Sequence, residues 1–145
     1  MRLLTPFLLG FVLAMVSPLP ATADDGRAVA QAMQTAAVAL IAGTRDDRRE
    51  ALLQPFTEAA RSNWHYTPRS RAGVAFKDMD AAQRAAAQAL LAAALSDAGL
   101  QKVRAVIALE IALRELEAFP FSRDPENYAV AIYGRPDAAS PWGWR

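Results

Sequence analysis

Apolar residues recur at helical spacing along much of the chain, and the first two predicted helices lie in its first half. Residues 27–42 carry an apolar stripe with the period of an α-helix, and Gly43 is the expected stop. Thr44 is expected to cap a second helix, in which Asp47 completes an approximate capping box. Pro55 should kink or divide this second helix, because proline removes a backbone donor.

A second pair of helices is predicted further along the chain. Asp80 and Gln83 have the spacing of a capping box and begin a helix that extends to about Asp97. Gly99 is expected to end this helix as a left-handed cap. A fourth helix covers about residues 100–118, and the short link between the two predicts an antiparallel helical hairpin.

Strand signals are weaker and lie mostly near the C-terminus. Residues 62–78 are expected to form a loop with a short strand at 64–66, whereas 128–133 is typical of a strand and 142–145 is expected to begin another. We expect the strand at 128–133 to lack sheet partners, which would leave the chain marginally stable or prone to aggregation. The predicted fold is α+β and predominantly helical, with four to five helices, an antiparallel helical hairpin and one or two short strands near the C-terminus.

The beginning of the chain has the pattern of a secretory signal peptide. Arg2 supplies a positive start, an apolar run extends from Leu3 to Val16, and residues 21–23 form a small-x-small cleavage pattern. The run is shorter than the about 20 residues that a membrane span needs, so no stable membrane anchor is expected. The predicted organisation is a signal peptide over 1–23 and a single domain over 24–145. The export machinery would carry it to the periplasm or the extracellular space.

Composition favours helix and excludes several kinds of chemistry. The 145 residues include 33 alanines and no cysteine, which excludes disulfides and thiolate sites. A net charge of +1 gives no basic footprint for nucleic acid. His65 is the one histidine, too few for a familiar zinc site, and we expect it to be a satisfied side chain packed between Trp64 and Tyr66. The sequence contains neither a serine-hydrolase motif nor a glycine-rich phosphate loop.

The fourth predicted helix carries charges on its apolar side. Glu110, Arg114 and Glu117 fall in the middle of its apolar stripe. In one interpretation Arg114 pairs with both glutamates at a solvated seam, and each pair contributes only about 0.2–0.5 kcal/mol. In the other, the charges line a pocket that serves a metal, a proton transfer or a cationic ligand. Alanines on the opposite side suggest that the helix is buried on both sides.

Arginine and aromatic residues outside the helices are further candidates for binding. Arg69 and Arg71 offer a bidentate fork to an anion, unless they simply belong to a solvated loop. Trp142 and Trp144 flank Gly143, and they either stack on a flat ligand or sugar or fill the core at the end of a strand.

A set of short motifs stands in a characteristic order along the chain. They are Trp64-x-Tyr66-x-Pro68-x-x-Arg71-x-Gly73, Met79-x-x-x-Gln83, Leu90-Leu91-x-x-x-Leu95-Ser96-x-x-Gly99, Leu109-Glu110 with Glu117, Arg123-Asp124-Pro125-x-x-Tyr128, Gly134-x-Pro136 and Trp142-Gly143-Trp144-Arg145. Together they resemble the DUF3500 family of exported proteins of unknown function, over roughly residues 28–145. In that family the last motif is typically followed by a glycine, a histidine pair and a β-rich region. The resemblance therefore implies that this chain is the N-terminal part of a longer protein and ends before the Gly-His-His segment.

With this resemblance, we expect one polar site in the complete protein. Its catalytic residues would be Glu110 and Glu117, and its ligand-binding residues would be Arg71, Arg114, Arg123, Tyr128, Trp142, Trp144 and Arg145. The enzymatic interpretation is metal-assisted or carboxylate-assisted hydrolysis of a small molecule, with a divalent metal as the candidate cofactor of the complete protein. The alternative is a non-catalytic extracytoplasmic module that binds a ligand or partner through a stacking surface of Trp64, Tyr66, Trp142 and Trp144.

Overall fold

The computed structural model describes residues 23–67, 69–117, 123–137 and 139–145. The helices of this part are α1 (Ala23–Gly43), α2 (Asp46–Leu52), α3 (Glu58–Ser62), α4 (Ala81–Ala94) and α5 (Asp97–Leu116), with 3-10 turns η1 (Phe76–Asp78) and η3 (Pro125–Asn127). Its strands are β1 (Leu53–Gln54), β2 (Val74–Ala75), β3 (Ala129–Val130), β4 (Ile132–Tyr133) and β5 (Gly143–Trp144). The predicted α+β, predominantly helical fold is confirmed. Residues 1–22 of the predicted signal peptide lie outside the described residues, and none of the described helices is long and apolar enough to span a membrane.

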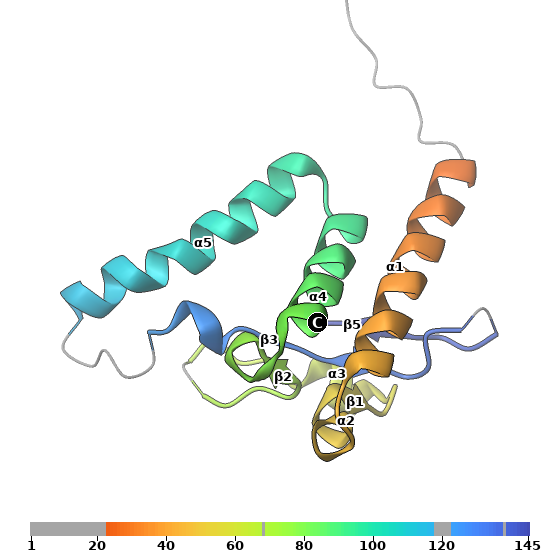
Figure 1. The fold of residues 1–145 in the computed structure, drawn as a ribbon, viewed down its shortest axis with the longest axis horizontal. Helices are drawn as coiled ribbons and strands as arrows, with labels where there is room; N and C mark the ends of the chain where they lie inside the picture. Colours follow the sequence, from red (N-terminus) through yellow and green to blue (C-terminus); the bar gives the residue numbers. More distant parts are fainter. Residues whose placement is uncertain (1–22, 68, 118–122, 138) are drawn as a thin grey trace, which may run out of the picture.

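The main helix pair of the fold is α1 with α4. Figure 1 shows these helices side by side and running in opposite directions. Both contribute buried side chains to the core, Ala37 and Leu40 from α1 and Ala87 and Leu90 from α4. Small alanine side chains let two helices approach closely, and the leucines fill the space that remains.

Two small sheets complete the core beside this helix pair. In the first, β4 lies between β1 and β5, and Ile132 pairs with Leu53 of parallel β1 and with Trp144 of antiparallel β5. In the second, β2 and β3 form an antiparallel pair. The expectation that the strand at 128–133 lacks sheet partners is therefore wrong, because β1, β2 and β5 supply them from distant parts of the chain.

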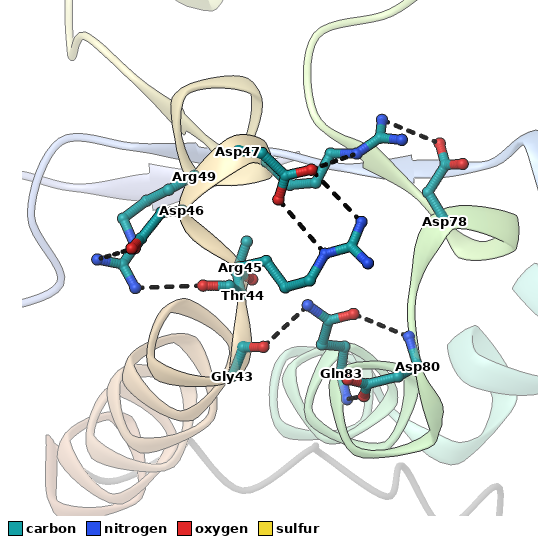
Figure 2. A network of polar contacts seen from close by, with 10 residues as sticks. Gly43, Thr44, Arg45, Asp46, Asp47, Arg49, Asp78, Asp80 and Gln83 are labelled. Carbon is teal, nitrogen blue, oxygen red and sulfur yellow. Dashed lines mark hydrogen bonds and ion pairs between the residues drawn. The ribbon is translucent and has the colours of Figure 1, made fainter.

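A polar junction fixes the end of α1 against the start of α4 (Figure 2). The Asp80 carboxylate accepts a hydrogen bond from the Gln83 amide, and the Gln83 side chain accepts one from the Asp80 amide, each at 2.8 Å. This confirms the predicted capping box. The buried Gln83 side chain also donates to the Gly43 carbonyl at 2.9 Å. Thr44 does not cap α2 as predicted; its buried hydroxyl donates to the Leu40 carbonyl at 2.7 Å and satisfies the end of α1 instead.

Charged side chains surround this junction without forming a site. The Asp47 carboxylate lies 3.3 Å from the Arg45 guanidinium, and Arg48 lies 3.7 Å from Asp78 (Figure 2). These side chains are well exposed, and exposed ion pairs contribute little to stability. The α2 N-cap is Arg45, which makes no side-chain capping bond.

The link between α4 and α5 differs from its prediction. Helix α4 ends at Ala94, and the Ser96 side chain caps α5 by accepting a hydrogen bond from the Gly99 amide at 3.2 Å. Gly99 therefore lies inside the first turn of α5 and is not a left-handed cap, since positive φ occurs among described glycines only at Gly73 and Gly134. Ser96 is a favourable N-cap because its hydroxyl accepts a hydrogen bond from a backbone amide of the first turn that has no partner within the helix.

Helix α5 leaves the body of the molecule. It turns back after the short link, as a hairpin requires, and then diverges from α4 (Figure 1). It contains no fully buried residue, and its large apolar side chains Val106, Leu109, Ile111 and Leu116 are 49% to 81% exposed. The prediction that this helix is buried on both sides is wrong, because no described element covers its outer face.

The region around Pro55 agrees with prediction only in part. The helix is divided there as expected, into α2 and α3, with β1 between them. Residues 64–66, however, form no strand; the strand of this region is β2, ten residues beyond Trp64.

Candidate functional site

Arg123 gathers the two glutamates of α5 into one cluster. Its Nε and Nη2 donate to the Glu117 carboxylate at 2.7 and 2.6 Å, which is a bidentate pair. Its Nη1 lies 3.6 Å from Oε2 of Glu110, whose side chain is only 13% exposed. The hydrogen bonds from Arg123 lower the pKa of Glu117, and the same contacts raise the pKa of Arg123.

Tyr128 completes this cluster from the segment before β3. Its hydroxyl donates to Oε1 of Glu110 at 3.0 Å. Partial burial raises the pKa of Tyr128, and the Glu110 carboxylate adds to the effect. We call Glu110, Glu117, Arg123 and Tyr128 the α5 cluster.

Arg114 lies beside the α5 cluster but serves another purpose. Its Nε donates to the Arg123 carbonyl at 2.6 Å, and its Nη2 lies 3.6 Å from the Asp124 carboxylate. The solvated-seam interpretation predicted that Arg114 pairs with Glu110 and Glu117. That prediction is wrong, because Arg114 contacts the Arg123 carbonyl and Asp124 instead. Asp124 also accepts a hydrogen bond from the Glu126 amide at 3.0 Å and so caps η3.

Chemically, the α5 cluster joins α5 to the 123–128 segment. Arg123 contacts both carboxylates, but its single positive charge balances only one of them, and the buried Oε2 of Glu110 has no hydrogen-bond partner among the described residues. No group of three or more histidine, cysteine, aspartate or glutamate side chains that could hold a metal ion occurs among the described residues. A partly buried carboxylate is costly unless it is paired, so Arg123 and Tyr128 stabilise Glu110 only in part.

Arg71, the expected anion-binding residue, is used to close a loop. Its guanidinium donates to the carbonyls of His65, Thr67 and Arg69 at 2.6, 2.8 and 3.2 Å. These three contacts join the Arg71 side chain to the backbone of His65, Thr67 and Arg69. Partial burial and the charges of Arg69 and Arg71 lower the pKa of His65, which also hydrogen-bonds Asn63 at 2.9 Å.

The aromatic residues of this loop are exposed. Trp64 is 67% exposed and Tyr66 is 87% exposed, so neither packs around His65 as expected. We call residues 63–67 and 69–71 the aromatic–basic loop. Its sequence surroundings are basic as well, since residues 59–77 contain three arginines and a lysine and no acidic residue.

The C-terminal motif divides between core and loop. Trp142 and Trp144 pack against the core, which favours the core-filling alternative over a stacking surface. Arg145 donates to the Asn63 carbonyl at 3.1 Å and stacks over Tyr133 at 5.3 Å from the ring centre. The last residue therefore ties β5 to the start of the aromatic–basic loop.

The predicted site residues thus fall into three places. Glu110, Glu117, Arg123 and Tyr128 come together, with Arg114 beside them; Arg71 makes its contacts within its own loop; and the tryptophans and Arg145 lie at the C-terminal strand. The exposure of Trp64 and Tyr66 had one signal in the sequence, namely that they occur among turn formers with no apolar periodicity around them.

Comparison with known proteins places the chain in one family. Residues 26–145 match the family model described as Protein of unknown function (DUF3500). Neither the curated proteins nor the solved structures gave a match. Because the matched region covers most of the sequence and includes every motif quoted above, the chain belongs to the DUF3500 family.

Proposed function

We propose that this protein is an exported, non-catalytic module that binds an acidic saccharide through the aromatic–basic loop. The observation that carries the proposal is the exposure of Trp64 and Tyr66, at 67% and 87%, in a loop whose backbone is fixed by Arg71. Exposed aromatic side chains in a fixed loop are more characteristic of a binding surface than of a core.

The contacts of Arg71 support a loop that is shaped without a ligand. The Arg71 guanidinium donates hydrogen bonds to three carbonyls of the loop. The backbone that carries the two aromatic rings therefore has a defined conformation without a ligand. A preformed loop loses less conformational entropy on binding than a mobile one. Arg71 is therefore a positioning residue in this proposal.

The charge of the loop favours an anionic ligand. Arg69 is exposed in the same loop as the two rings, and the stretch from 59 to 77 carries four cations and no carboxylate in a chain whose net charge is only +1. Arginine binds carboxylates in a bidentate manner, and aromatic faces stack on the apolar face of a ring. A uronic acid combines both features, since it is a ring that carries a carboxylate.

Export is part of the proposal and rests on the first residues of the chain. The positive start, the apolar run from Leu3 to Val16 and the small residues before Asp24 are the features of a signal peptide. The family match begins at residue 26, just beyond this segment.

The hydrolase interpretation of Glu110 and Glu117 has less support. A general base or metal ligand needs a carboxylate that is free to take a proton or a cation. Arg123 holds Glu117 in a bidentate pair, while Glu110 accepts a hydrogen bond from Tyr128 and lies 3.6 Å from Arg123. Measuring bound metal in the wild type and in Glu110→Gln would restore this interpretation if the wild type alone held a stoichiometric divalent ion.

Calorimetry with matched trisaccharides tests the binding proposal. Tri-galacturonic acid should bind saturably and maltotriose, which is neutral, should not. Trp64→Ala should weaken binding by about tenfold, the order of one stacking contact. Arg69→Ala should also weaken it, whereas Arg104→Ala, which removes an exposed arginine from α5, should leave it unchanged. Equal binding of the two trisaccharides, or equal loss in both arginine variants, would refute the proposal.

A further inference from the structure

A second surface feature lies apart from the aromatic–basic loop and from the α5 cluster. It is an open groove of about 650 Å³ between α1, β1 and the segment that follows β4. Its lining includes Val38 and Ile41 of α1, Leu53 of β1 and Pro136 of the segment that follows β4. Its volume falls within the range of small-molecule sites, which is roughly 300–1,000 Å³.

The walls of the groove are fixed relative to each other. The Gln34 side chain of α1 donates to the Pro136 carbonyl at 3.2 Å, which ties the two walls together. The Gly134 amide donates to the Gln54 carbonyl at 2.9 Å and joins the segment after β4 to β1. Within this frame Val38 is 48% exposed, so an apolar side chain faces solvent along the groove.

Two arginines give the lining of the groove a net positive charge. Arg49 and Arg135 both line it, with Asp137 as the one acidic lining residue. Arg49 is 44% exposed; it lies 3.1 Å from Asp46 and donates to the Thr44 carbonyl at 3.2 Å. Arg135 is 89% exposed and lies 3.8 Å from Asp137, which is 39% exposed. Exposed pairs of this kind are weak, so a ligand carboxylate can compete for either arginine.

We infer that this groove binds a small amphipathic carboxylate, with its aliphatic chain along Val38, Ile41 and Leu53 and its carboxylate at Arg49 or Arg135. The inference does not depend on the proposed function, because the two sites share no residue. The aliphatic chain covers exposed apolar surface, which is favourable in water. The charge of the groove selects an anionic head group over a cationic one.

The test uses decanoate and decyltrimethylammonium, which share a ten-carbon chain and differ in the charge of the head group. Both are titrated into the wild-type protein by calorimetry, below the concentration at which they form micelles. Decanoate should bind saturably and at least about threefold more tightly than the cation. Val38→Glu should weaken decanoate binding by about tenfold, since it places a negative charge on the apolar wall.

Val29→Glu is the matched control for this substitution. Val29 is an exposed valine on the same helix, 42% exposed, and does not line the groove. Its variant should bind decanoate within about twofold of the wild type. Arg49→Gln provides a second test. It should reduce the difference in affinity between decanoate and decyltrimethylammonium, because it removes a positive charge and leaves the apolar contacts in place.

Three results would overturn the inference. These are a failure of decanoate to saturate, binding of the two amphiphiles with equal affinity, and equal losses in Val38→Glu and Val29→Glu. If Val38→Glu proves unfolded by circular dichroism, the comparison of head groups in the wild type and in Arg49→Gln still decides the matter.

Discussion

At the scale of single residues, Arg123 is the side chain on which the position of α5 depends. It donates two hydrogen bonds to Glu117 and lies within ion-pair distance of Glu110. Helix α5 contributes no fully buried side chain to the core. Polar contacts with the 123–128 segment, those of Arg123 foremost, therefore take the place of the apolar packing that usually holds a helix.

The pairing of Glu117 makes stability depend on pH. Arg123 lowers the pKa of Glu117 in the folded protein, so the stabilisation is present above the ordinary pKa of 4.5 and is lost as the pH falls through the folded value. Glu117→Gln should therefore lose less stability than the wild type between about pH 6 and pH 3. Urea unfolding at several pH values measures this. Glu115→Gln, an exposed change on the same helix, should keep the wild-type dependence, and an unchanged dependence in Glu117→Gln would contradict the assignment.

Two glycines should respond to alanine in opposite directions. Gly73 has φ of +117°, and a Cβ there would collide with the Val130 carbonyl, so Gly73→Ala should cost about 1–3 kcal/mol. Gly26 lies in α1 with open space around it, so Gly26→Ala should stabilise by up to about 0.5–1 kcal/mol. Thermal unfolding of both variants measures the difference, and a stabilising Gly73→Ala would show that this backbone conformation is not required.

Residue-scale prediction succeeded where a helical period was enough. The helical period predicts that Glu110 and Glu117 lie on the same side of the helix. In the structure both contact Arg123, as that prediction requires. The partner of Arg114 could not be predicted. Spacing along one helix allows Glu110 and Glu117, and only the tertiary position of η3 brings Asp124 closer.

At the scale of elements, α4 and α5 differ in how they are attached. Helix α4 buries Gln83, Ala87 and Leu90, while α5 buries no residue fully. Their caps should therefore differ in importance, because a cap adds to global stability only when its helix unfolds together with the core.

Removing each cap tests this difference. Asp80→Ala should lower the free energy of unfolding by about 0.5–2 kcal/mol, because it breaks the capping box of a core helix. Ser96→Ala should cost less in global unfolding and should instead increase hydrogen exchange in the first turn of α5. Equal global costs would mean that α5 unfolds together with the core.

Element prediction depended on how local each signal is. The Asp80–Gln83 capping box involves four consecutive residues and was found. Thr44 carried the same kind of signal, but the free carbonyl of Leu40 lay closer to its hydroxyl. The strands are two residues long and pair across distances of up to 79 positions, as Leu53 with Ile132, which no local pattern indicates.

At the scale of the whole molecule, one core joins the α1–α4 pair to both sheets. Leu40, Leu52, Leu90 and Ile132 are its fully buried large side chains, and they come from helices and a strand that are distant in sequence. Helix α5 and the aromatic–basic loop lie outside this core and expose their apolar side chains. The molecule therefore separates a compact core from exposed surfaces that are available for binding.

Leucine truncations should reproduce that separation. Leu90→Ala removes a fully buried side chain and should cost about 2–5 kcal/mol. Leu116→Ala removes one that is 81% exposed and should change stability by no more than about 0.5 kcal/mol. Urea unfolding compares the two, and a large cost for Leu116→Ala would show that α5 is covered in solution.

The candidate site was harder to predict than the fold. A tryptophan or tyrosine is more often buried than exposed, so Trp64 and Tyr66 were expected to enclose His65. In the structure both are exposed, and Arg71 donates to the backbone carbonyls of His65 and Thr67 beside them, contacts that sequence spacing does not indicate. Trp142 and Trp144 are also aromatic residues near turn formers, yet they pack against the core, whereas Trp64 and Tyr66 are exposed.

The central claim is that the aromatic–basic loop is the surface on which this protein binds acidic saccharides. Backbone amide and tryptophan indole chemical shifts, followed while tri-galacturonic acid is added to the isotope-labelled protein, test it most directly. We predict saturable shifts at the Trp64 indole and at the amides of the loop, with the Trp142 and Trp144 indoles and the amides of α5 unchanged. Shifts confined to α5 or to the C-terminal strand, or no shift at any concentration, would contradict the claim.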